Sequence, residues 1–228
     1  MSFDPALLLT ALTNAAMLQG AAIALILSVM VFAVSFFLCL PLALCLNSRK
    51  PVRNGSAQLY VWVFRAAPLI LVLLLVWNGS PQLMPFLLKA GWFTPFVAAA
   101  ISFTLVTSAY MAEIMKGALR SIGAGQGEAA TALGLTRLQA FRLVILPQAL
   151  RVSLPALVNE FINLLKVTSL AYVISLREIM AVVNDAIAAS FRFVEWYCAA
   201  LIYYLVIVSL FMLAQSLIAR RMQQGLKA

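Results

Sequence analysis

The stretch Gly125–Pro147, GQGEAATALGLTRLQAFRLVILP, is the segment around which the rest of this chain is organised. It is the only long interval in the middle of the chain that is not simply apolar, and stretches apolar enough to cross a membrane lie on both sides of it. Keeping a loop of this length ordered costs conformational entropy, so we expect it to have a function. We predict a short helix that docks on a partner outside the membrane, with Pro147 as the stop signal of the stretch.

The composition is that of an integral membrane protein. Hydrophobic residues make up 64% and charged residues 10% of the 228 residues, whereas soluble domains average about 45–50% and about 25%. The chain has no histidine, and its seven acidic residues are scattered. We therefore expect neither a metal site nor a catalytic centre. The basic residues are distributed among loops and do not form one patch, which argues against a nucleic-acid surface. As an integral membrane protein, the chain is expected to contact membrane lipid.

Five stretches are long and apolar enough to span a bilayer at about 1.5 Å per residue of helix. They are expected at residues 20–46, 58–77, 94–115, 153–175 and 197–219. The sequence thus predicts an all-α membrane protein of about five transmembrane helices that forms a single domain over residues 1–228.

The basic residues indicate the orientation of these spans. Most of the 16 follow the first, third and fifth stretches, namely Arg49, Lys50, Arg53, Lys116, Arg120, Arg137, Arg142, Arg151, Arg220, Arg221 and Lys227. The loops on the opposite side hold only Lys89, Arg177 and Arg192. Because cytoplasmic loops carry the excess of Lys and Arg, we expect the N-terminus outside and both the C-terminus and the Gly125–Pro147 loop in the cytoplasm.

The central stretch resembles the EAA loop of permease subunits of bacterial ATP-binding cassette importers. The family pattern is Glu-Ala-Ala, three residues, Gly, nine residues, an apolar residue, one residue, Leu and Pro; it falls here on residues 128–130, Gly134, Val144, Leu146 and Pro147. The flanking segments are similar to the polar amino acid subfamily: FRAAPL (64–69), AYMAEIMKGALRSI (109–122), LPQALRVSLPALVNEF (146–161) and LLKVTSL (164–170). The chain departs from the family at residues 66–67, often Gly-Thr, and at Val167, often Asp.

The resemblance implies a type I importer permease fold in the bacterial cytoplasmic membrane, crossed several times. It implies a second permease subunit, identical or similar, and an ATPase dimer that docks from the cytoplasm and binds the ATP and Mg. This chain has no GxxxxGK[ST] loop and is expected not to be an enzyme. An extracytoplasmic binding protein would deliver the substrate, a polar amino acid or a related compound such as an opine.

The coupling loop of about residues 121–150 would make the contact with the ATPase. By resemblance, Glu128, Ala129, Ala130 and Gly134 carry the docking. The alanines favour a helix, Glu128 is expected near the helix start where its charge meets the dipole, and Gly134 allows a sharp helix end. The alternative is an inert amphipathic loop at the membrane surface.

Ionisable side chains inside spans indicate a functional site, because they are costly in a bilayer. On the fourth span Asn159, Asn163 and Lys166 fall at i, i+4 and i+7, with Glu160 at the edge of this stripe. On the third span Thr107, Tyr110 and Glu113 are spaced by three, and two such ridges could line a water-accessible path. The candidates for the substrate path are Arg65, Tyr110, Glu113, Asn159, Glu160, Asn163 and Lys166.

An amino acid substrate offers a carboxylate for Arg65 and an ammonium or cationic side chain for Glu160. Glu160 therefore favours a cationic amino acid, with neutral and acidic substrates open. Alternatively, Arg65, Glu113 and Lys166 pair structurally or extend to the membrane surface. A different class of protein, an ion-coupled secondary amino acid transporter, would usually show more spans and internal repeats.

Overall fold

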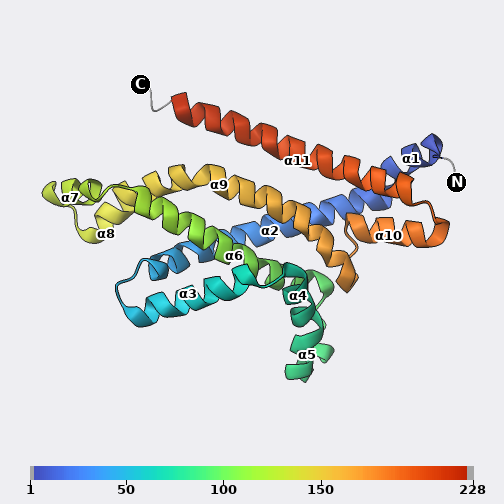
Figure 1. Cartoon of the computed structure of the whole chain (residues 1–228), viewed down its shortest axis with the longest axis horizontal. Helices are drawn as coiled ribbons and strands as arrows, with labels where there is room; N and C mark the ends of the chain where they lie inside the picture. The colour runs from blue at the N-terminus through green and yellow to red at the C-terminus, as the bar shows by residue number, and fades with distance from the viewer. Residues whose placement is uncertain (1–2, 225–228) are drawn as a thin grey trace. The chain divides into compact units, whose positions relative to one another are not determined.

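The computed structural model describes residues 3–224, and in this range the regular structure is helical throughout (Figure 1). The elements are α1 (Pro5–Leu12), α2 (Ala15–Leu46), α3 (Pro51–Ala66), α4 (Leu69–Leu74), the π turn η1 (Leu75–Gly79), α5 (Ser80–Leu83), the 3₁₀ turn η2 (Pro85–Lys89), α6 (Pro95–Ser121), α7 (Ala124–Ala132), α8 (Arg137–Ala140), the π turn η3 (Phe141–Ile145), α9 (Leu146–Val167), the 3₁₀ turn η4 (Thr168–Ile174), α10 (Ile179–Ser190) and α11 (Phe193–Gln224). Lys227, counted above among the cytoplasmic charges, lies outside the described residues, as do the side chains of Arg220 and Arg221.

The helices confirm an all-α membrane fold with about five spans. Four stretches are long and apolar enough to cross a membrane: Ala15–Leu46, Pro95–Ser121, Arg137–Ile174 and Phe193–Ser216. A fifth span is present if Pro51–Ala66 and Leu69–Leu83 are counted as one broken span. The first, fourth and fifth of these helices begin earlier than predicted, at Ala15, Arg137 and Phe193.

The second predicted span is not one continuous helix. α3 ends at Ala66, and Ala67 is extended, with φ −71° and ψ 133°. Pro68 follows as the N-cap of α4. Proline has no N–H to donate and disfavours the helical conformation of the residue before it, so the helix must stop here. The span predicted over 58–77 is therefore present as two helices that meet at a bend of 102°.

The described chain forms two compact units. Unit 1 consists of Met1–Phe32, Pro68–Thr104 and Phe161–Ala228, and unit 2 of Ala33–Ala67 and Leu105–Glu160. Three long helices, α2, α6 and α9, contribute residues to both units. The prediction of a single domain over 1–228 stays a prediction.

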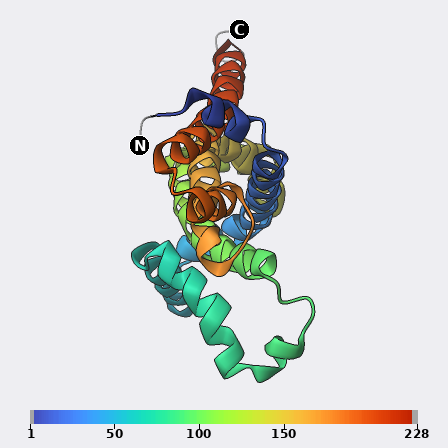
Figure 2. The same cartoon turned by 90° about the vertical axis from the view of Figure 1, so that its right-hand side faces the viewer.

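The first apolar cluster of unit 1 joins the two ends of the sequence. Its buried members come from α1, the start of α2, α10 and α11, and include Met17, Ile179, Val183 and Trp196. Figures 1 and 2 show α1 beside the first turns of α11. Gly20 allows this packing to be close, because a Cβ at that position would lie 2.8 Å from the carbonyl carbon of Glu178.

Polar contacts fix both ends of α1 on α11. The Asp4 N–H donates to Glu195 Oε1 at 2.9 Å, and a guanidinium nitrogen of Arg192 lies 2.8 Å from the same oxygen. At the other end of α1, the Tyr203 hydroxyl donates to the Leu12 carbonyl at 2.8 Å. Glu195 is nearly fully buried, and a buried carboxylate is stable only when paired and hydrogen-bonded, so these contacts explain why an acidic residue is found there.

A second cluster fills unit 1 around η4. It gathers Leu27 and Val31 of α2, Phe103 of α6 and Leu164 of α9. Phe161 adds edge-to-face and tilted contacts with Phe32 and Phe211. These segments of α2, α6 and α9 are thus held by apolar packing in unit 1.

Unit 2 is held by hydrogen bonds between α3 and α6. The Tyr60 hydroxyl lies 2.8 Å from Ser108 Oγ and 3.0 Å from the Leu105 carbonyl oxygen. Near the end of α6, the Arg120 Nε donates to Asn47 Oδ1 at 2.7 Å. These contacts hold the part of α6 that leads into the α7–α8 loop.

Candidate functional site

The end of α7 is built around the positive φ of Gly134. The Leu135 N–H donates to the Ala130 carbonyl at 3.1 Å, and the Gly134 N–H donates to the Thr131 carbonyl at 2.9 Å. These two bonds are those of a Schellman motif, in which the residue after the cap is left-handed. Gly134 has φ +82°, a conformation that residues with a Cβ rarely adopt. The predicted sharp helix end at Gly134 is confirmed.

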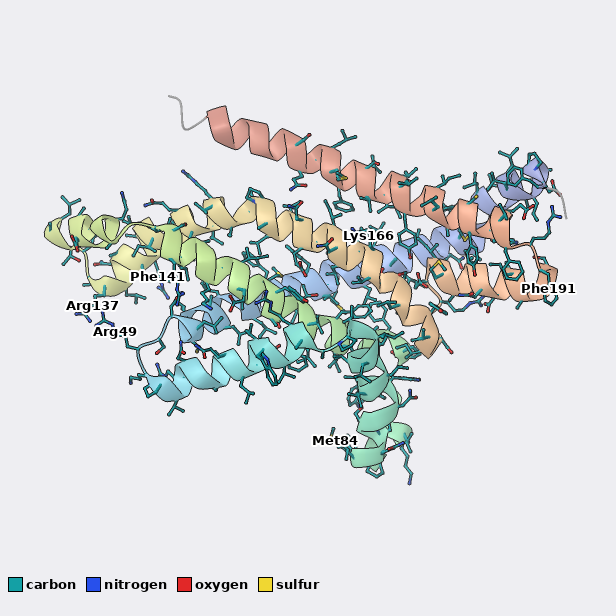
Figure 3. The ribbon with its side chains drawn as sticks, viewed as in Figure 1. Arg49, Met84, Arg137, Phe141, Lys166 and Phe191 are labelled. Carbon is teal, nitrogen blue, oxygen red and sulfur yellow. The ribbon has the colours of Figure 1, made fainter. Side chains whose placement is uncertain are left out.

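The second helical segment begins with a capping box. The Gln139 N–H donates to Thr136 Oγ1, and the Thr136 N–H donates to Gln139 Oε1. α8 follows, and Figure 3 shows Arg137 and Phe141 in this part of the loop. The helix then continues through the π turn η3 into α9. A reciprocal cap of this kind satisfies two N–H groups that would otherwise lack partners.

Two local predictions about this loop are wrong. Glu128 lies in the middle of α7, whose first turn holds no acidic residue, so it gains little from the helix dipole. Pro147 does not stop the helix but lies in the first turn of α9. A proline clashes with the carbonyl four residues before it, and the wider π turn at Phe141–Ile145 relieves that clash.

The loop exposes an apolar surface beside its turn. Glu128, Ala129 and Gly134 are exposed, and the side chain of Leu133 is 83% exposed. Ala130, in contrast, is buried within the chain. Because the loop faces the cytoplasm in the predicted topology, the exposed Leu133 and Gly134 form a surface suited to a protein partner.

The loop is also attached to the helix that follows it. The amide of Gln148 donates to Gln126 Oε1 at 3.2 Å. A Cβ at Gly127 would make an ordinary contact with Ile145 of η3. α7 is therefore braced against the start of α9, so that a displacement of α7 would be transmitted to that helix.

Three of the predicted path residues meet in unit 2. An Arg65 guanidinium nitrogen lies 4.0 Å from Glu113 Oε2, and the Arg65 guanidinium lies over the Tyr110 ring at 5.4 Å. Lys116 Nζ lies 2.9 Å from Glu113 Oε1. The Glu113 carboxylate is thus shared by two cations, which agrees with the structural pairing considered above for Arg65 and Glu113.

The polar stripe of α9 is present as predicted by spacing. Asn159, Asn163 and Lys166 are exposed, and Glu160 is half-buried. Asn159 and Glu160 belong to unit 2, whereas Asn163 and Lys166 belong to unit 1; Figure 3 shows Lys166 on α9. Their contact with a substrate stays a prediction.

Unit 1 holds further polar residues, outside the loop and the path, that were not predicted from the sequence. Arg177, just before α10, pairs with Asp185 of α10 at 3.6 Å. Glu178 is fully buried and caps α10 by accepting the Ala181 N–H at 3.0 Å. An acidic residue directly before the apolar run of α10 is a helix-start signal that could have identified this cap. Within residues 3–224, no three His, Cys, Asp or Glu side chains gather as metal ligands would.

Comparison with known proteins identifies the family. Residues 35–224 match the family described as the binding-protein-dependent transport system inner membrane component. A probable amino-acid ABC transporter permease protein of Vibrio harveyi is 45% identical over 163 residues, 71% of this chain and 72% of the relative. The octopine transport system permease protein of Rhizobium radiobacter is 39% identical over 212 residues, 89% of this chain and 84% of the relative.

A solved structure shows the same fold. A chain of the structure described as an amino acid ABC transporter with histidines superimposes with a TM-score of 0.84 at 31% identity, covering 97% of this chain and 100% of that one. Permeases of this family are multi-pass inner membrane subunits of importers in which a separate subunit hydrolyses ATP. The chain belongs to the family of inner membrane components of binding-protein-dependent transport systems and is a permease subunit of the ATP-binding cassette importer class.

Proposed function

We propose that this chain, with a second permease subunit of identical or similar sequence, forms the translocation path of an ATP-driven importer for polar amino acids. An ATPase dimer that binds ATP and Mg docks on the α7–α8 loop, and an extracytoplasmic binding protein delivers the substrate. The substrate class rests on the names of the relatives, which specify amino acids and octopine.

One observation carries the coupling role: the Schellman turn at Gly134 presents Leu133 at 83% exposure. In the family the EAA segment contacts the ATPase, and here Glu128, Ala129 and Gly134 lie exposed on the same short loop. Ala130 contributes differently, because its side chain is buried and its carbonyl accepts the Leu135 N–H that closes the turn. The bracing of α7 on α9 then gives ATPase closure a mechanical route into a membrane helix.

The coupling role predicts a defect specific to Gly134. A side chain at φ +82° adds backbone strain of about 1–3 kcal/mol, and leucine also adds bulk on the proposed docking surface. We expect Gly134→Leu to insert normally and to lose ATP-driven uptake of a labelled amino acid in proteoliposomes that contain the ATPase and the binding protein. Gly55→Leu is the control, because Gly55 is helical and has open space around it.

Normal uptake by Gly134→Leu, at wild-type abundance, would count against the coupling role. Omitting ATP, or adding vanadate, separates an ATP-driven importer from a secondary transporter in the same vesicles. Uptake that persists without ATP and follows an ion gradient would contradict the proposed function as a whole.

The substrate role predicts a difference between two acidic residues. Glu160 is proposed to bind the substrate ammonium or a cationic side chain. Glu113 pairs with Arg65 and Lys116 and is proposed to position Arg65. Losing a hydrogen bond to a charged group costs about 1.5–3 kcal/mol, so Glu160→Gln should raise the KM for uptake by roughly 10- to 100-fold. Glu113→Gln should change KM less, since its side chain is proposed to position Arg65. An unchanged KM and rate in Glu160→Gln would remove Glu160 from the path.

A further inference from the structure

Unit 1 contains a polar hollow that belongs neither to the loop nor to the predicted path. Its volume is about 400 Å³. It is lined by Tyr172, Ser175, Arg177, Ala181, Asn184 and Asp185. This volume lies in the lower part of the range of about 300–1,000 Å³ typical of small-molecule sites. The predicted topology places this segment on the external side of the membrane.

The walls of the hollow are held in place by the fold. Ser175 ends η4 with φ +64°, and its N–H donates to the Tyr172 carbonyl at 2.9 Å. On the other wall, Ala181, Asn184 and Asp185 occupy positions i, i+3 and i+4 and therefore share one face of α10. The opposite face of α10 is packed in the first apolar cluster of unit 1. The hollow is thus a preformed feature between two fixed segments.

The charges of the hollow suit a ligand that carries both signs. Arg177 and Asp185 are 72% and 69% exposed, and their nitrogen and oxygen are 3.6 Å apart, which is longer than a hydrogen bond. An exposed pair of this kind contributes little stability and is easily opened. A guanidinium binds a carboxylate through two parallel hydrogen bonds, and a carboxylate accepts from an ammonium.

We propose that this hollow is a low-affinity external subsite for zwitterionic α-amino acids. The ligand carboxylate binds Arg177, its ammonium binds Asp185, and its side chain lies towards Tyr172 and Asn184. The subsite extends the proposed amino-acid importer function, because it gives the substrate a holding place on the chain apart from the path around Glu160. Both charged groups are exposed, so we expect a Kd of about 1 mM.

The test measures occupancy by protection of a cysteine in the hollow. Ser175→Cys introduces the reporter, in the assembled transporter in nanodiscs and in a background in which Cys39, Cys45 and Cys198 are replaced by alanine. The rate of reaction with a membrane-impermeant maleimide is followed with and without free L-glutamine, whose zero net charge avoids an effect of ionic strength. Ser190→Cys is the matched control, since Ser190 is exposed at the end of α10 and does not line the hollow.

At a ligand concentration of about ten times the Kd, roughly nine-tenths of the sites are filled, so labelling at position 175 should slow about tenfold. Labelling at position 190 should not change. N-acetyl-glutamine, which lacks the ammonium, and 4-aminobutyramide, which lacks the carboxylate, should not protect. Arg177→Gln or Asp185→Asn should remove the protection by L-glutamine.

Three outcomes would overturn the subsite. The first is the absence of protection by free glutamine, arginine and glutamate in a transporter that imports amino acids. The second is equal protection by the two half-ligands. The third is protection that requires the binding protein and not the free amino acid, which would make the hollow a protein contact. Labelling does not depend on transport, so protection in a transporter that imports no amino acid would refute the proposed function alone.

Discussion

The close packing of α2 against the start of α10 gives a stability prediction whose sign can be derived from the structure. Gly20→Ala replaces a helical glycine, and in an open helix this change stabilises by about 1 kcal/mol. At Gly20, however, the added Cβ would lie 2.8 Å from the carbonyl carbon and 3.1 Å from the carbonyl oxygen of Glu178, and 2.9 Å from the Ile179 nitrogen. These are backbone atoms, so no side-chain rotation relieves the contacts.

The start of α10 has little freedom to move away. Glu178 and Ile179 are both fully buried. The Glu178 carboxyl group accepts hydrogen bonds from the Ala181 N–H and the Tyr204 hydroxyl. Overpacking at such a place costs about 1–3 kcal/mol, and rigid neighbours favour the upper end. With the helix gain of about 1 kcal/mol subtracted, the net loss is about 2 kcal/mol.

For a chain of this size, about 2 kcal/mol lowers the apparent Tm by about 4–8 °C. The measurement is thermal unfolding of the purified full chain in detergent. Gly55→Ala is the matched control, because Gly55 also lies within a helix but has nothing within 4 Å of its Cβ position; its Tm should rise by about 2–4 °C. The two substitutions are predicted to shift stability in opposite directions. A Tm of Gly20→Ala equal to or above that of the wild type would refute the close approach.

Two further predictions concern the same part of unit 1. Tyr203→Phe removes the hydrogen bond to the Leu12 carbonyl and should lower the free energy of unfolding by about 1 kcal/mol. Tyr197→Phe, at an exposed position, is the control and should leave the Tm unchanged. Equal Tm shifts in the two variants would contradict the attachment of α1 to α11 by this bond. Burial raises the pKa of the Glu178 carboxyl to about 7, from 4.5, and Glu178 lies outside the candidate spans. Because the folded state binds this proton more tightly than the unfolded chain, Glu178 contributes its full stabilisation below about pH 4.5, and that stabilisation is lost as the pH rises to about 7. The Tm should therefore fall between about pH 5 and 7.5. Glu178→Gln should reduce this fall, and an unchanged pH dependence would contradict a titrating Glu178.

The local features of the α7–α8 loop could be predicted because they depend on neighbouring residues. Gly134 at a left-handed position and the Thr136 cap follow from rules that act within five residues. The spans could be predicted for a similar reason, since their apolar composition is a property of each stretch. Pro68 is a local signal of the same kind, because a proline ends the helix before it, and α3 stops just before it at Ala66.

Features that join distant residues could not be predicted in this way. Nothing near Gly20 in the sequence indicates that the backbone of Glu178 passes beside it. Asp4 and Glu195 lie 191 positions apart, and their hydrogen bond depends on how α1 packs on α11. The hollow likewise depends on the turn at Ser175, where a non-glycine residue adopts a positive φ, and residue type alone rarely predicts that conformation.

The charges around Arg65 show what the structure adds to the sequence. The sequence identifies Arg65 and Glu113 as ionisable groups within spans but does not assign their partners. In unit 2 the Glu113 carboxylate neutralises only one of its two basic neighbours, Arg65 and Lys116. The cluster therefore keeps one net positive charge, which would attract the carboxylate of the proposed substrate and repel a cationic side chain. A cationic amino acid would then bind this cluster only by its carboxylate, and recognition of its side chain would require a separate acidic residue, the role proposed for Glu160.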